Sequence, residues 1–202
     1  MTLHQNQIAV IGVVYPAVKK YLYEYLESLE NQSNNKFDLL LANDGLTNTE
    51  EYLKHYPTLK VILHKLTGSI TEIRIQIIQL ALEAGYKKII FTDCDDTIAI
   101  NRIEVTEELL DYDPIIFNDL NVTNESGVVK EKNYFSNRLK DKSLINSNDF
   151  LHCNMMGLSN AATTNIVLSK IINNIKNRTI IAFDWLLWTY AINNGYQAKF
   201  TN

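Results

Sequence analysis

Three carboxylates stand within four consecutive positions of the chain, at Asp93, Asp95 and Asp96. Side chains of like charge repel one another, so this crowding is costly unless a cation or water relieves it. Carboxylate oxygens are ligands that Mg²⁺ and Mn²⁺ prefer, and these ions are commonly shared between a protein and the phosphates of its substrate. The cluster predicts a divalent-cation site, and the alternative is an exposed acidic turn without a ligand.

The segment before this cluster is the last of four predicted β-strands. Residues 8–14 are a nearly continuous apolar run, typical of a strand buried on both faces of a parallel sheet. Residues 37–42, 61–63 and 88–92 repeat that signal, and amphipathic helical segments separate them. This alternation predicts a doubly wound α/β sheet, whose ligands bind beyond the carboxyl ends of the strands. The aspartates emerge at such an end, which favours a ligand site over an acidic turn.

Local signals mark where several helices begin and end. Pro16 suits the first turn of a helix whose apolar stripe runs to Leu29. Thr47 and Ser69 each precede a glutamate at capping-box spacing. Gly85 suits the end of the helix that starts after Ser69.

The second half of the chain has a different pattern. Strands are predicted over residues 114–117 and 128–135, followed by an irregular segment over 143–157. Two helices are predicted to close the chain, over residues 161–176 and 183–194.

Composition limits the classes of function. The 202 residues are 46% hydrophobic with a net charge of −4, which predicts one globular domain without a basic field for nucleic acid. The two cysteines are too few for a disulfide framework, and no signal segment or run of about 18 apolar residues occurs. We therefore expect a cytoplasmic protein with no transmembrane segment. If its substrate is lipid-linked, it would contact the inner membrane face peripherally.

One short motif resembles that of a phosphatase family. Residues 89–97, an apolar strand followed by D-x-D-x-T, look like the first motif of the haloacid-dehalogenase-like phosphatases. That resemblance implies Asp93 as a phosphoryl-accepting nucleophile and Asp95 as its acid/base partner. The family usually carries this motif on its first strand, however, and no downstream lysine and paired-aspartate motif completes the site here.

A second resemblance covers nearly the whole chain. The order and spacing of its segments are similar to those of the family 2 glycosyltransferases with the GT-A fold: residues 8–15, 25–33 and 37–45, then Gly68, Arg74 and the D-x-D-D of 93–96. It implies a Rossmann-like three-layer α/β/α domain with a mostly parallel central sheet, spanning residues 1–202 as a single domain. Residues 1–96 would form the nucleotide-sugar-binding half, and residues 97–202 the acceptor-side half.

The same resemblance implies a site for a UDP- or GDP-linked sugar. Val14 and Tyr15 would lie against the base, and Asp44 would accept a hydrogen bond from it. Arg74 would meet the diphosphate or the acidic cluster, and Asp93 would approach the ribose. Two plainer interpretations stay open: Asp44 belongs to an Asn-Asp-Gly turn that needs no ligand, and Arg74 is a solvated helix residue.

The resemblance further implies a metal and a catalytic base. Asp95, with Asp96, would hold the Mn²⁺ or Mg²⁺ that stabilises the leaving diphosphate. The base would be an acidic residue at the start of a late helix, which Asp184 matches, although Phe183 replaces the usual glutamate. The alternative is that Asp184 simply caps its helix.

Acceptor-side residues complete the pattern. Asn154 and Gly157 precede Asp184 at the spacing of the family's acceptor-side loop. Trp185 could form a platform for a sugar ring, but Trp185 and Trp188 at this spacing more often belong to a core.

The resemblance as a whole predicts a metal-dependent, inverting glycosyltransferase with a glycan or lipid-linked acceptor. The setting it implies is bacterial surface polysaccharide or other glycoconjugate synthesis, and a homo-oligomer could complete the acceptor site. A phosphatase using Asp93 and a degenerate domain that binds sugar nucleotides without turnover are the alternatives.

Overall fold

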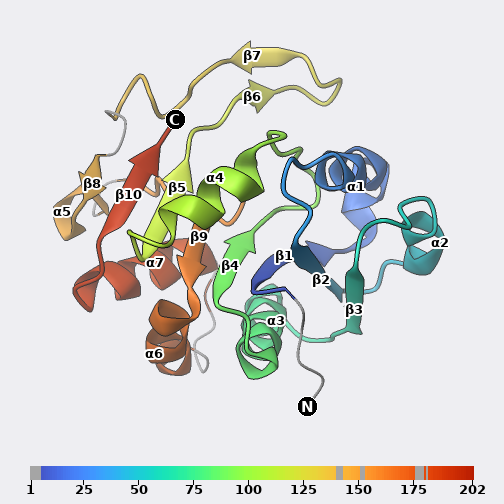
Figure 1. The fold of residues 1–202 in the computed structure, drawn as a ribbon, viewed down its shortest axis with the longest axis horizontal. Helices are drawn as coiled ribbons and strands as arrows, with labels where there is room; N and C mark the ends of the chain where they lie inside the picture. Colours follow the sequence, from blue (N-terminus) through green and yellow to red (C-terminus); the bar gives the residue numbers. More distant parts are fainter. Residues whose placement is uncertain (1–5, 140–142, 151–152, 176–179, 181) are drawn as a thin grey trace.

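The chain folds around one eight-stranded, mostly parallel sheet (Figure 1). The structure is a computed structural model that describes residues 6–139, 143–150, 153–175, 180 and 182–202. Across the sheet the strands stand in the order β3 (Val61–Lys65), β2 (Phe37–Asn43), β1 (Ile8–Val14), β4 (Lys88–Phe91), β9 (Ala161–Thr164), β5 (Ile115–Asn118), β10 (Ala198–Thr201) and β8 (Leu144–Ile145). Apart from β8 and β9, the strands all run in the same direction, so their carboxyl ends share one edge.

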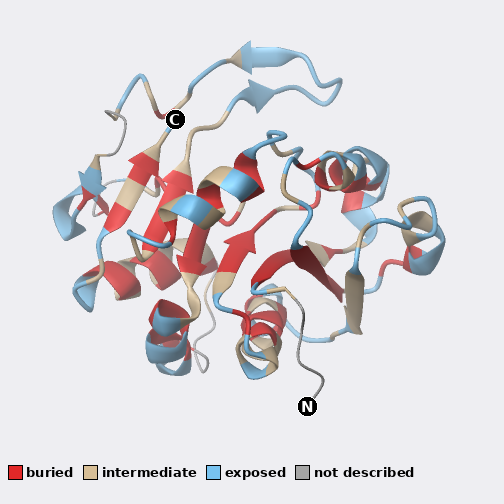
Figure 2. Cartoon of the chain, in the orientation of Figure 1, coloured by how far each residue is buried: buried red, intermediate tan, exposed pale blue. Residues whose placement is uncertain are grey.

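Helices cover both faces of this sheet and bury it. The helices are η1 (Pro16–Lys20), α1 (Leu22–Glu30), α2 (Thr49–Leu53), α3 (Ile70–Ala84), α4 (Arg102–Leu109), α5 (Ser147–Phe150), α6 (Asn165–Ile175) and α7 (Phe183–Asn193). One apolar core joins the sheet to α3, α6 and α7, and a second core joins the opposite face to α1 and α4. Figure 2 shows the central strands of the sheet buried, whereas the edge strand β3 is intermediate or exposed throughout and the edge strand β8 is exposed at Leu144. The predicted three-layer α/β/α arrangement is confirmed.

Several predicted helix signals are confirmed. The stripe from Val18 to Leu29 is buried against the sheet. Ser69 and Glu72 form a reciprocal capping box at the start of α3, and Gly85 ends that helix with a φ of 88°, a conformation that glycine adopts without strain. Of the helices in the described part of the chain, none is long and apolar enough to cross a membrane.

The helix predicted over residues 161–176 is partly wrong. Residues 161–164 are the strand β9, inserted antiparallel between β4 and β5, and the helix α6 begins only at Asn165. Alanine favours helices, but here its small side chain lets a strand pack between two others on both faces, and Thr163 and Thr164 are β-branched. Residue 176 lies outside the described residues.

Other local predictions also differ from the structure. Thr47 does not cap α2, because that helix starts after Asn48, which adopts a left-handed conformation without a side-chain cap. Within the strand predicted over 128–135 only β7 (Val129–Glu131) forms, paired with β6 (Val122–Thr123) in an exposed hairpin. The segment 143–157, expected to be irregular, contains β8 and α5. The sequence prediction missed α4 and β10.

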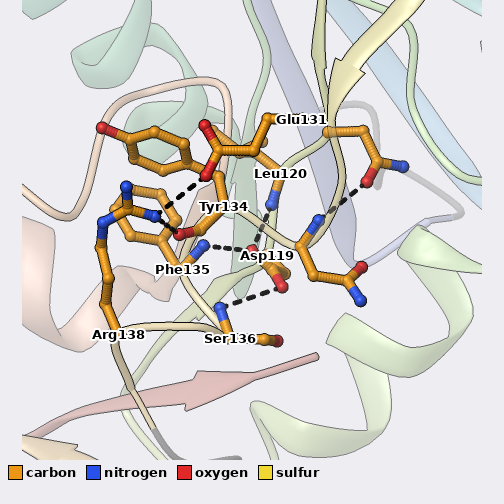
Figure 3. Close-up of polar contacts among 9 residues, drawn as sticks. Asp119, Leu120, Glu131, Tyr134, Phe135, Ser136 and Arg138 are labelled. Atoms are coloured by element: carbon orange, nitrogen blue, oxygen red, sulfur yellow. Dashed lines mark hydrogen bonds and ion pairs between the residues drawn. The ribbon is translucent and has the colours of Figure 1, made fainter.

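The carboxylate of Asp119 holds the segment after this hairpin in place by hydrogen bonds (Figure 3). It follows β5, and its carboxylate accepts backbone hydrogen bonds from Leu120 at 2.8 Å, Phe135 at 2.7 Å and Ser136 at 3.1 Å. Because β5 is parallel to β4, this anchor lies at the same edge of the sheet as the acidic cluster.

Candidate functional site

The acidic cluster begins where β4 ends, next to β1 at the centre of the sheet. The Thr92 amide and hydroxyl both donate to the carbonyl of Ile11, at 2.9 and 3.0 Å. The hydroxyl oxygens of Tyr25 and Thr92 lie 2.7 Å apart. These buried hydrogen bonds tie the two strands together, so Asp93 leaves the sheet from a fixed position at its carboxyl edge.

Asp93 lies in a negative environment that the fold assembles from distant segments. Desolvation raises its pKa to about 6, the Arg74 guanidinium opposes that rise, and Asp96, Asp95 and Asp184 add to it. Asp184 lies on α7, so the fold brings its carboxylate into electrostatic range of the cluster. This crowding of carboxylates at one place is the arrangement that a cation relieves.

Arg74 extends from α3 towards the cluster. Its Nη2 lies 3.8 Å from Oδ1 of Asp93, and its side chain is only 23% exposed. Its Nε is buried and has no hydrogen-bond partner within the described part of the structure. A buried guanidinium N–H without an acceptor is unfavourable, and a phosphate oxygen is an acceptor that it suits. Arg74 is therefore not the solvated helix residue of the plainer interpretation.

Val14 ends β1 and Tyr15 follows it, and of the two only Tyr15 has a side chain that a ligand can contact. The pKa of Tyr15 is raised by desolvation, and then by Asp95 and Asp93, which places its ring close to the acidic cluster. Val14 is fully buried, so its side chain cannot touch a ligand. Its carbonyl accepts a 2.8 Å hydrogen bond from the amide of Asp44.

Asn43, rather than Asp44, holds the turn after β2. The Asn43 side chain accepts from the amide of Leu46 at 2.8 Å and donates to the Leu46 carbonyl and the Thr49 hydroxyl at 2.9 Å. Gly45 takes the left-handed conformation, with a φ of 81°. The expected turn therefore exists, but no hydrogen bond or ion pair within the described chain occupies the carboxylate of Asp44.

Asp184 lies in the first turn of α7 without capping it. The N-cap is Ala182. The Asp184 Oδ2 instead accepts a 2.9 Å hydrogen bond from Nδ2 of Asn154. A side-chain Cβ at Gly157 would lie 3.9 Å from the same Oδ2. The structure thus brings together three of the residues predicted for the acceptor side.

Asp96 is joined to the same neighbourhood through Ser159. Desolvation and the charge of Asp95 raise the pKa of Asp96, and the Ser159 side chain opposes that rise. Ser159 belongs to the segment that also carries Asn154 and Gly157.

The two tryptophans of α7 have different surroundings. Trp188 is fully buried and meets Phe91 edge to face, at 5.7 Å between ring centroids, so it belongs to the core. Trp185 is half-buried, and its Nε1 donates to the carbonyl of Phe150 at 3.0 Å. It lines a groove with residues of α5 and α7, among them Ser147 and Thr189.

Comparison of the sequence with protein families identifies the family of this chain. The profile described as Glycosyl transferase family 2 matches residues 9–174. This chain belongs to glycosyl transferase family 2. A search of curated proteins finds no match.

Solved structures share the fold of this family 2 chain. S. aureus TarS (residues 1–349) superposes with a TM-score of 0.73 at 19% identity, over 96% of this chain and 57% of TarS. The same TarS fragment has been solved with UDP and with UDP-GlcNAc. The mannosyltransferase PcManGT from Pyrobaculum calidifontis, in complex with GDP-Man and Mn²⁺, gives a TM-score of 0.64 at 15% identity, over 97% of this chain and 54% of PcManGT. The family 2 chain spans somewhat more than half the length of these relatives.

The carboxylates of the family 2 chain fit a divalent cation by their chemistry. Asp95 and Asp96 are exposed residues, and the charges of Asp96, Asp95 and Asp184 add to the desolvation that raises the pKa of Asp93. Across the residues that the structure describes, no group of three or more His, Cys, Asp or Glu side chains is placed to hold a metal ion without further ligands. Mg²⁺ is typically held by one or two carboxylates, with phosphate oxygens and water as the other ligands, so a partial set is the arrangement expected before a nucleotide binds.

Two residues that support the site were missed in the sequence. Arg102 on α4 is buried and donates from Nη2 to the carbonyl of Phe91 at 2.9 Å. Desolvation lowers its pKa to about 10, whereas Tyr25 and the nearby aspartates oppose that change. Gly12 on β1 leaves no room for a side chain, because a Cβ would lie 2.7 Å from the Tyr25 hydroxyl. An isolated arginine or glycine carries no sequence signal of such a role.

Proposed function

We propose that this family 2 chain is a metal-dependent, inverting glycosyltransferase that moves a sugar from a UDP- or GDP-linked donor to a hydroxyl group. The observation that carries the proposal is one site at the carboxyl edge of the sheet, where Arg74 lies 3.8 Å from Asp93 and the charge of Asp184 acts on the same carboxyl group. The complexes of TarS with UDP-GlcNAc and of PcManGT with GDP-Man and Mn²⁺ support the same donor class.

The first half of the chain, residues 1–96, supplies the donor site in this proposal. Tyr15 and the backbone of Val14 would border the base, and the carboxylate of Asp44 would accept a hydrogen bond from it. Asp93 would face the ribose. The Nε of Arg74 would donate to a diphosphate oxygen, which satisfies its buried N–H.

Asp95 and Asp96 would hold the Mn²⁺ or Mg²⁺ of the donor. When bound, such an ion stabilises the negative charge that develops on the leaving diphosphate. The exposure of both carboxylates leaves them open to the ion and to phosphate oxygens.

Asp184 would act as the base in the acceptor-side half, residues 97–202. The acceptor oxygen forms a bond to the anomeric carbon while the bond from that carbon to the diphosphate oxygen breaks, and the hydroxyl proton passes to Asp184. A single displacement of this kind inverts the anomeric centre. Asp184 is free for this task because it does not cap its helix. The acceptor would be a glycan or a lipid-linked saccharide of bacterial surface polysaccharide or another glycoconjugate.

Calorimetric titration tests the donor site. UDP, GDP, UDP-GlcNAc and GDP-mannose are titrated into the wild type with Mn²⁺ and again with a chelator, and into Asp95→Asn. The matched control is Asp111→Asn, which removes an exposed carboxylate that pairs with Lys88 at 2.5 Å. We expect metal-dependent binding that Asp95→Asn abolishes and Asp111→Asn retains.

Each contrary result has a separate meaning. If none of the four compounds binds, either with or without metal, the proposal is refuted. Phosphoryl trapping on Asp93 would then test the phosphatase alternative. Binding without transfer or hydrolysis would favour a degenerate domain that binds sugar nucleotides without turnover.

A further inference from the structure

The carboxylate of Asp184 is held by a side chain from a different part of the chain. Nδ2 of Asn154 donates to Oδ2 of Asp184 at 2.9 Å. The residues are 30 positions apart, so this contact exists only because the fold brings the start of α7 to the segment before β9. It occupies Oδ2 of Asp184, and within the described residues Oδ1 of Asp184 has no hydrogen bond or ion pair.

The segment that carries Asn154 is itself firmly anchored. Met155 and Met156 are buried in the core. Asn160 is also buried, and its Nδ2 donates to the carbonyls of Met155 at 3.2 Å and Asn118 at 3.1 Å. Asn154 is thus attached to buried residues rather than to a free loop, so its amide can fix the orientation of a partner.

The same segment contacts the other end of the site. Ser159 interacts with the carboxylate of Asp96. Between Asn154 and Ser159 stands Gly157, where a Cβ would approach both the Ser159 hydroxyl at 3.7 Å and Oδ2 of Asp184 at 3.9 Å. A single short segment therefore borders Asp184 and the metal-side carboxylate together.

We propose that Asn154 is a positioning residue for the base: its amide holds Oδ2 of Asp184, so that Oδ1 faces the acceptor hydroxyl at a fixed distance from the donor site. This inference rests on the proposed function, in which Asp184 takes the acceptor proton. Fixing one oxygen of a base is a way of holding the reacting groups in the productive geometry.

The test measures donor hydrolysis, with water as the acceptor, in the presence of Mn²⁺. Release of UDP from UDP-GlcNAc and of GDP from GDP-mannose is followed for the wild type, Asn154→Ala, Asn154→Asp, Asn154→Gln and Asp184→Ala. Asn154→Asp keeps the shape of the side chain but replaces the N–H donor by a carboxylate oxygen, so it sets a second negative charge against Oδ2 of Asp184. The matched control is Asn146→Ala, because Asn146 is exposed and its side chain accepts only from the nearby Asn148 amide within the described chain.

We expect kcat to fall roughly ten- to hundredfold in Asn154→Ala and Asn154→Asp, as for loss of a hydrogen bond to a charged group. The KM for the donor and the affinity for UDP should stay close to wild type in Asn154→Ala. Asn154→Gln, which retains an amide, should recover part of the loss, and Asn146→Ala should retain the wild-type rate.

A double variant separates positioning from a merely structural effect. If Asn154 acts through Asp184, then Asn154→Ala combined with Asp184→Ala is no slower than Asp184→Ala alone. Additive losses, or an unchanged kcat in Asn154→Ala while Asp184→Ala is slow, would overturn the inference and leave the proposed function standing. A wild-type rate in Asp184→Ala, or no hydrolysis of either donor by the wild type, would refute the proposed function and the inference with it.

Discussion

Replacing Gly12 by alanine should destabilise the sheet directly beneath the site. A Cβ at this position would lie 2.7 Å from the Tyr25 hydroxyl, 2.8 Å from Sγ of Cys94 and 3.2 Å from a methyl of Leu41. The first two separations are shorter than van der Waals contact allows, and each partner is buried. The Tyr25 hydroxyl cannot withdraw without weakening its 2.7 Å contact with Thr92, which holds β4 to β1.

The size of the effect follows from three contributions. Overpacking a buried site costs about 1–3 kcal/mol, and a weakened buried hydrogen bond adds about 1 kcal/mol. The backbone of Gly12 is not in the left-handed region, so alanine offsets up to about 1 kcal/mol by restricting the unfolded chain. The net loss in free energy of unfolding is about 1–4 kcal/mol, which lowers Tm by roughly 2–16 °C in a chain of this size.

Thermal and denaturant unfolding of four variants measures this loss. Gly157→Ala is the matched control, because its Cβ would meet neighbours at no less than 3.7 Å, and its Tm should stay within about 2 °C of wild type. Tyr25→Phe removes the atom that a Cβ would strike first, so Gly12→Ala should cost less in that background than in wild type. The reasoning is refuted if Gly12→Ala melts at or above the wild-type temperature, or if Tyr25→Phe leaves its cost unchanged.

Three further predictions address the helix cap and the charges of the site. Ser69→Ala should lower the free energy of unfolding by about 1 kcal/mol in thermal unfolding, because it removes the capping box of α3. Thr47→Ala should have no measurable effect, because Thr47 does not cap α2. Equal losses in the two variants would contradict this difference between the two helix starts. The pKa of Asp93 is raised to about 6 in the folded protein. In metal-free protein the protonated carboxyl group therefore contributes stability that is fully present below about pH 4, and this contribution is lost as the pH rises to 6 and above. Asp93→Asn should therefore raise the free energy of unfolding at pH 7 by about 1 kcal/mol, after allowance for solvent screening, with little change at pH 4; a gain at pH 4 as large as at pH 7 would refute this cause. Arg74→Ala should weaken the affinity for UDP about ten- to hundredfold in calorimetry. Arg74→Lys should recover only part of that affinity, and full recovery would exclude a role for the Nε of Arg74.

The first half of the fold could be predicted because its signals are local and strong. The strand β1 is a continuous apolar run, β2 is mostly apolar, and the capping box of Ser69 and the terminating Gly85 mark both ends of α3. Such signals depend on neighbouring residues only, so they are visible without knowledge of the fold.

The second half was harder because its elements depend on distant partners. Residues 161–164 have the residue types of a helix start, yet they pair with β4 and β5 as a strand. The short strands β8 and β10 hydrogen-bond to each other although three helices and another strand separate them along the chain. No periodicity within four residues or fewer can predict pairing of this kind.

The sequence by itself determined the residue types of the site and its place at the carboxyl end of β4. Acidic residues directly after a buried strand, together with the order of motifs that family 2 shares, are enough to identify Asp93, Asp95 and Asp96 as candidates. Only the tertiary structure decided which side chains meet there: Arg74 against Asp93, and Asn154 against Asp184. The physical reason is that identity and local spacing are properties of the chain, whereas contact between α3, β4, α7 and the segment before β9 depends on how the buried sheet and its two cores pack.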